Sequence, residues 1–248
     1  MALDFWIKTS GTWINVVTVL AGTGLGLLLR GRLPMRMQRI IIQGVGLITL
    51  LIGLSMAASL TEVRAGVVDG VILGLLALVI GGLLGEWWQL EAVLEAVGDW
   101  LKQRFQGKGS FTEGFVAASL LFCVGPLALL GSINNGLIGD NTLLTLKASM
   151  DGLAAIALTS SFGMGVGFSA LSILVYQGGI SLGAGWLAQA LPEDPTASPL
   201  VLVTTGVGGL MILGLGLNLL EMTNIRVASF LPALLLAPLI YWLAAIAT

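Results

Sequence analysis

The sequence predicts an all-α, polytopic transmembrane helix bundle with seven or eight spans, an inverted repeat and one amphipathic interfacial helix. Of the 248 residues, 56% are hydrophobic and only 10% are charged, whereas soluble domains carry about 25% charged residues. The apolar residues form continuous runs long enough to cross a bilayer. The 35 glycines suit the close helix packing found in lipid. Together these observations exclude an ordinary soluble enzyme.

Eight apolar runs are the candidate spans, because a helix needs about 20 mostly apolar residues to cross the hydrocarbon core. The expected spans are 12–29, 40–60, 66–85, 113–131, 142–160, 163–181, 198–220 and 226–247. If the run 142–160 is re-entrant, the number falls to seven and the C-terminus changes side.

Basic residues set the expected orientation, since cytoplasmic loops carry an excess of Lys and Arg. The loop after the first run and the segment two crossings later hold most of them: Arg30, Arg32, Arg36, Arg39, Lys102, Arg104 and Lys108. We therefore expect both termini on the outer side of a bacterial cytoplasmic (inner) membrane.

The segment 86–105 has a different pattern, in which apolar residues recur at spacings of three and four and charges fill the other face. The apolar positions are Trp87, Leu90, Leu94, Val97, Leu101 and Phe105. This pattern predicts an amphipathic helix at the cytoplasmic interface, serving either as a gate or as a plain linker. The flexible segment 107–110 follows, so we expect an N-terminal half over 1–109 and a C-terminal half over 110–248.

A short repeat links the second and seventh runs. Gly44-Val45-Gly46 opens the second run, and Gly206-Val207-Gly208 opens the seventh. These two runs cross the membrane in opposite directions, as inverted repeats of secondary transporters do.

The segment 125–141 begins as apolar helix and then acquires a proline, four glycines, three asparagines and an aspartate. We expect it to be broken at membrane depth, where free carbonyls and amide side chains can replace the hydration shell of an ion. The alternative is an external loop in which Asp140 and Asn141 cap the next helix. The candidate ligands here are Ser132, Asn134, Asn135 and Asp140.

Ionisable and amide side chains inside the spans are the other candidates, because such groups are costly in lipid. Lys147 and Asp151 are four residues apart and can pair on one helix face. Asn15 and Gln177 are amides in apolar runs, and Ser169 follows the pair Gly163 and Gly167, which indicates a close helix crossing or a polar path.

Several chemistries have no residues to carry them. The chain has no histidine and one cysteine, which removes His-based acid–base catalysis and the usual zinc sites. We predict no enzyme activity, catalytic residue, metal site or cofactor. The net charge of −2 predicts no nucleic-acid partner.

The chain resembles the YqgA/YdfK-like family of bacterial integral-membrane proteins, whose function is unknown. The core of the resemblance is Gly131-x-Ile133-Asn134-x-Gly136-x-x-Gly139-Asp140, Lys147-x-x-x-Asp151, Gly163, Ser169 and Gln177. It extends to Ile14-Asn15, the glycines 22, 24 and 26, Arg32-Leu33-Pro34, Gly85-Glu86 and Leu231-Pro232-Ala233-Leu234. The resemblance implies a multi-pass membrane protein without an established reaction.

Two positions depart from the family pattern. Asn135 stands where members often carry an acidic residue, and Ser229 stands where they often carry Asn. If these positions bind a cation, its affinity or selectivity differs in this protein.

Two functions remain open. The first is a transporter or channel for a small solute, most simply a monovalent cation such as sodium, with a polar site around 131–151. The second is a membrane scaffold or assembly factor that docks a partner through the helix 86–105. The expected contacts are the lipid bilayer and a small ion or solute, and the glycine-rich faces also suit a homodimer.

Overall fold

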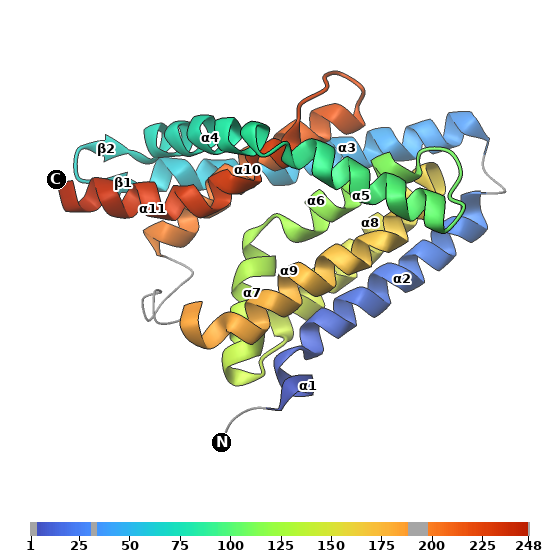
Figure 1. The fold of residues 1–248 in the computed structure, drawn as a ribbon, viewed down its shortest axis with the longest axis horizontal. Coiled ribbons are helices and arrows are strands. Elements are labelled where there is room, and N and C mark those ends of the chain that lie inside the picture. The colour runs from blue at the N-terminus through green and yellow to red at the C-terminus, as the bar shows by residue number, and fades with distance from the viewer. Residues whose placement is uncertain (1–3, 31–33, 188–197, 248) are drawn as a thin grey trace. The chain divides into compact units, whose positions relative to one another are not determined.

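The chain is almost wholly helical in a computed structural model that describes residues 4–30, 34–187 and 198–247 (Figure 1). The helices are α1 Phe5–Lys8, α2 Ser10–Arg30, α3 Met35–Ala57, η1 Ala58–Glu62, α4 Gly70–Trp87, α5 Leu90–Arg104, α6 Phe111–Cys123, α7 Pro126–Ile138, α8 Thr142–Phe162, α9 Gly165–Leu187, α10 Pro199–Leu219, η3 Val227–Phe230 and α11 Leu231–Ala247. An antiparallel hairpin of β1 Arg64–Ala65 and β2 Val68–Asp69 joins η1 to α4. Its turn contains Gly66, whose φ of +57° suits glycine.

Seven helices in the described part of the chain are long and apolar enough to cross a membrane. They are α2, α3 with η1, α4, α8, α9, α10, and α11 with η3. The predicted all-α, polytopic membrane fold is thereby confirmed. The run expected at 142–160 is the continuous helix α8 of 21 residues, which is long enough to span.

The span expected at 113–131 is wrong in its bounds, because α6 ends at Cys123 and α7 begins at Pro126. The two helices meet at an angle of 62°. Gly125 at the junction has a φ of 148°, a conformation that side chains with a Cβ rarely adopt. The break therefore lies at the first residues of the segment expected at 125–141, and residues 126–138 are helical. Proline is well suited to the first position of a helix, so it starts α7 rather than breaking it.

The pair α6–α7 forms one broken span, because α9 runs beside both helices in the same direction. Gly165, at the start of α9, lies against the carbonyl of Phe111 at the start of α6. Gly136 of α7 lies against the carbonyl of Ser181, near the other end of α9. A re-entrant segment would have to turn back toward its starting side. The described residues thus hold eight candidate spans when the pair counts as one.

The chain divides into two compact units. Unit 1 holds residues 1–45 and 95–190, and unit 2 holds 46–94 and 191–248. This division differs from the boundary expected near residue 109, because α5 and α6 pack together across that segment. Gly98 of α5 lies against Thr112 and Phe115 of α6, and the Thr112 hydroxyl donates to Asp99 at 2.6 Å.

Unit 2 consists of antiparallel helix pairs that approach through glycine. Gly53 of α3 lies against Gly209 of α10, and Gly81 of α4 lies against Ala233 of α11. α3 and α10 end at Ala57 and Leu219, an offset of 162 residues that also separates Gly44 from Gly206. An inverted repeat produces such antiparallel pairs, although the repeat itself stays a prediction.

The amphipathic helix is shorter than expected. α4 continues to Trp87, and Gln89, with a φ of 54°, separates it from α5. Gly98 and Leu101 are buried, whereas Val97 and Trp100 are exposed. Val97 and Trp100 therefore point away from the protein core, as expected for a helix at a membrane interface.

Candidate functional site

Four polar side chains from three helices of unit 1 form a buried cluster. Lys147 and Asp151 of α8 make an ion pair with exposed fractions of only 6% and 7%. The Asn15 amide of α2 donates to Asp151 Oδ2 at 2.9 Å and to Gln177 Oε1 of α9 at 3.2 Å. Asn15 and Gln177 are completely buried. The structure thus brings together residues separated by up to 162 positions in sequence.

Glycines set the depth at which these helices meet. Gly22 of α2 faces the carbonyl of Gly152, and Gly26 faces the carbonyl of Ile156, so a Cβ at either glycine would collide with α8. These contacts align α2 with α8 in parallel, and Asn15 falls beside Asp151. α9 runs antiparallel to α2. Figure 1 shows α2 beside α8 and α9.

The ion pair is an expensive feature of an apolar bundle. Removing an ion from water has an effective cost of several kcal/mol, and only good pairing and additional hydrogen bonds offset it. Asn15 supplies one such bond to Asp151 Oδ2. A buried charge pair at mid-span is a functional candidate by default.

The cluster continues into buried polar atoms without a protein hydrogen-bond partner. Within the described part of unit 1 these atoms are Thr12 Oγ1, Asn15 Oδ1, Ser132 Oγ, Gln177 Nε2 and Ser181 Oγ. Each such atom costs about 1–3 kcal/mol if it stays unpaired. The site therefore retains several hydrogen-bonding positions that a polar solute or water can satisfy.

Two of these residues, Thr12 and Ser181, were missed by sequence reasoning. Thr12 precedes Asn15 by three residues on α2, and Ser181 follows Gln177 by four on α9. Each therefore shares a helix face with a predicted site residue, and this spacing was the available signal. Ser132 was predicted, and its helix α7 packs on α9 through Gly136 and Ser181.

Asn135 was predicted as an ion ligand, but it holds the start of α2. Its Oδ1 accepts from the Gly11 backbone N–H at 2.9 Å, and its Nδ2 donates to the Ile7 carbonyl and the Ser10 hydroxyl, each at 3.0 Å. A helix start leaves N–H groups unpaired, and a side-chain oxygen satisfies one of them. Asn135 thus uses its amide within the protein.

Three other predicted residues lie outside the cluster. Asn134 is half-buried on α7, and no hydrogen bond of the described residues joins it to the cluster. The buried Ser169 hydroxyl donates to the Val166 carbonyl of its own helix at 2.6 Å. Asp140 is exposed and accepts from the backbone N–H and the hydroxyl of Thr142 at 2.9 and 2.6 Å.

Asp140, just before the N-cap residue Asn141, therefore holds the first residue of α8, and a substitution should show it. The hydrogen bonds from Thr142 hold the pKa of Asp140 below its usual range. A lowered pKa gives stability that is present above the ordinary carboxyl pKa and lost as the pH falls through the lowered value. We expect Asp140→Ala to lower the free energy of unfolding slightly at neutral pH and not in strong acid. Unfolding curves of wild type and variant across pH measure this, and a pH-independent difference would contradict it.

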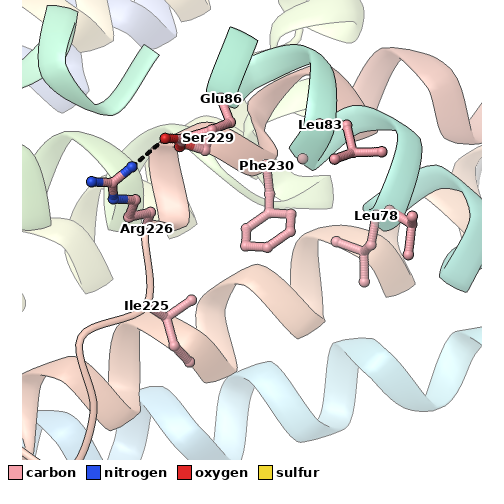
Figure 2. Close-up of a pocket in the computed structure, with 9 residues that line it drawn as sticks. Leu78, Leu83, Glu86, Ile225, Arg226, Ser229 and Phe230 are labelled. Carbon is pink, nitrogen blue, oxygen red and sulfur yellow. Dashed lines mark hydrogen bonds and ion pairs between the residues drawn. The ribbon is translucent and has the colours of Figure 1, made fainter. Parts of the chain in front are cut away.

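Unit 2 holds an apolar groove of about 420 Å³ between α4 and the segment around η3 (Figure 2). Figure 2 shows Phe230, Leu78 and Leu83 on its apolar side and the Glu86–Arg226 ion pair at its rim. That pair is more than half exposed, so solvent screens it. The groove presents fewer polar groups to a solute than the buried cluster does.

Comparison with known proteins places the chain in a family. Residues 10–242 match the family described as "Protein of unknown function (DUF554)". The chain belongs to this family. It is 32% identical over 231 residues to the "Uncharacterized membrane protein YdfK" of Bacillus subtilis, covering 93% of this chain and 94% of that protein. It is also 32% identical over 233 residues to the "Uncharacterized protein YqgA" of Escherichia coli, covering 92% and 94%.

These matches confirm the predicted resemblance, and no solved structure matches the chain. The DUF554 protein described here is a membrane protein with several spans. The two positions expected to depart from the family pattern lie outside the buried cluster. Asn135 caps α2, and the Ser229 hydroxyl of unit 2 donates to Glu86 at 3.3 Å. The geometry thus assigns both residues to bonds within the protein.

Proposed function

We propose that this DUF554 protein is a transporter or channel for a small solute, and that the solute is a monovalent cation bound at Asp151. The observation that carries the proposal is the buried Lys147–Asp151 pair surrounded by polar atoms without protein partners. A purely structural ion pair gains most when every neighbouring polar group is satisfied. Here several polar groups are unsatisfied, which favours a site whose ligands bind and dissociate.

The chemistry of the cluster suits a cation. Asp151 contributes the negative charge, and Asn15 Oδ1 is an amide oxygen without a protein partner. Amide, hydroxyl and carboxylate oxygens are the ligands that replace the hydration shell of hard cations. The Lys147 ammonium holds Asp151 in the absence of the cation, and a cation at the carboxylate competes with it. The pair can therefore switch between an internal and a bound partner.

The packing directions of unit 1 give the proposed site an orientation in the membrane. The packing directions agree with an eight-span arrangement, because α2 and α8 run parallel and α2 and α9 antiparallel. The basic residues at the end of α2 and in α5 belong on the cytoplasmic side by the positive-inside rule. The proposal thus places the protein in a bacterial inner membrane with both termini outside. It assigns no catalytic residue.

Flux measured in proteoliposomes tests this function. Purified protein is reconstituted, and the uptake of sodium, potassium, protons and chloride is followed separately. We expect flux of at least one monovalent cation above that of protein-free vesicles, and none of chloride. The Asp140→Asn variant serves as a matched control, because Asp140 is exposed on a helix cap. Absence of flux for all four ions would overturn the proposal.

A second candidate function is a scaffold, and the exposed apolar side chains of α5 favour it. Val97 and Trp100 are exposed on this helix, so a partner protein could cover them in place of lipid. Under this reading Lys147 and Asp151 only hold unit 1 together, and exchanging the two charges preserves function. A stoichiometric partner that co-purifies with wild type and is lost with Trp100→Glu would support the scaffold.

A further inference from the structure

The polar groups around the candidate site are distributed unevenly along the helices of unit 1. Toward the start of α2 lie Thr12 and Ser181, whose buried hydroxyls have no protein partner. Ser181 lies beyond Gln177 in this same direction, because α9 runs antiparallel to α2. Buried hydroxyls without protein partners are ordinarily solvated by water or ions. Water or ions are therefore expected on the side of the cluster that faces the start of α2.

Ser132 extends this set to a third helix. α7 and α9 run parallel, and Gly136 lies against the carbonyl of Ser181. One turn earlier on each helix are Ser132 and Gln177, so Ser132 lies at the level of the cluster. Its hydroxyl is fully buried and has no protein partner. Three helices thus contribute hydroxyls without protein partners, at the level of the cluster and toward the start of α2.

The opposite side is polar as well, but its hydroxyls are satisfied. Thr159 donates to Thr23 at 3.5 Å, Ser160 donates to the Ala157 carbonyl at 2.7 Å, and Ser169 donates to the Val166 carbonyl. All four of these side chains are buried. Each of these four hydroxyls has at least one protein partner.

Helix spacing shows the same asymmetry. A Cβ built on Gly167 would lie 2.9 Å from Thr23, which is closer than side chains normally pack. A Cβ on Gly178 would lie 3.8 Å from Thr12, an ordinary contact. α2 and α9 are thus tightly apposed toward the end of α2 and less so toward its start. The asymmetry belongs to α2 and α9, because Gly11, Gly22 and Gly26 keep α2 close to α8 along its whole length.

We propose that Thr12, Ser132 and Ser181 line a hydrated path by which a small cation reaches Asp151 from the end of unit 1 where α2 begins, while the other end is closed. The cation as cargo rests on the proposed function, whereas the path itself does not. Hydroxyl oxygens suit this role because they can accept from water or coordinate a cation through their lone pairs. By the positive-inside rule the path opens to the outer side.

Cysteine accessibility tests the path, because the chain contains a single native cysteine, Cys123. In a Cys123→Ala background, Thr12→Cys and Ser181→Cys report the path, and Thr23→Cys and Ser169→Cys are matched buried controls. The full-length protein in detergent is treated with a small cationic methanethiosulfonate reagent, and modification is followed by mass spectrometry. Only variants with the elution profile and thermal stability of the background are compared.

We expect the two path positions to react at least about tenfold faster than the controls. The thiolate is the reactive form of cysteine, and burial without water disfavours it. Equal reaction rates at all four positions would contradict the proposal that the other end is closed. Unreactive cysteines at 12 and 181 would overturn the path. Fast labelling at 12 and 181 alongside absent ion flux would leave the path standing and overturn the proposed cargo.

Discussion

Asp151→Asn is expected to abolish cation flux in proteoliposomes. The substitution keeps the shape of the side chain but removes the charge that attracts the cation. Lys147 then loses its ion-pair partner, which lowers the free energy of unfolding. Flux is therefore compared only for folded protein, in which the loss of the binding charge is the difference that remains.

The matched control is Asp140→Asn, which removes a carboxylate from the exposed cap of α8 rather than from the cluster. We expect this variant to transport at the wild-type rate. Flux is measured at equal protein density in vesicles, and both variants are checked for monodisperse elution. Undiminished flux through Asp151→Asn would contradict the assignment of the site to Asp151.

Lys147→Met is expected to lower the free energy of unfolding by about 3–5 kcal/mol, because it leaves the Asp151 charge buried without its partner. The double variant Lys147→Met with Asp151→Leu should recover most of that loss, since apolar side chains of similar volume often replace a buried ion pair at little cost. Asn15 keeps its hydrogen bond to Gln177 in this variant. Denaturant titration of the three proteins in one detergent measures both effects.

The double variant also separates stability from function. It is expected to be folded and stable yet to transport nothing, because neither member of the switch remains. Wild-type flux through the double variant would assign the pair a structural role only. A double variant as unstable as Lys147→Met would show that the loss comes from packing rather than from an unpaired charge.

Local sequence patterns predicted much of this molecule, because they depend on neighbours along one helix. Lys147 and Asp151 are four residues apart and must share a face once α8 forms. The alternative reading of Asp140 as a helix cap rested on the same local logic, and Asp140 does bond to Thr142. The break between α6 and α7 was placed too broadly, because a proline signals either the end or the start of a helix.

Contacts between distant segments decided the rest. Asn135 has the residue type of an ion ligand, but its amide bonds to Gly11, 124 positions away. No spacing within the segment 125–141 reveals that partner. Thr12 and Ser181 share helix faces with Asn15 and Gln177, but their place in the site depends on the meeting of α2 and α9.

The sequence by itself determined that this protein is a multi-span helical membrane protein with one ion pair within a span. Those features follow from apolar run length and from helical periodicity, which are local properties. Only the tertiary structure decided which polar residues join that pair and which hydroxyls remain unsatisfied. These outcomes depend on the depth at which α2, α7, α8 and α9 dock, and that depth is set by backbone contacts at glycines such as Gly22 and Gly136.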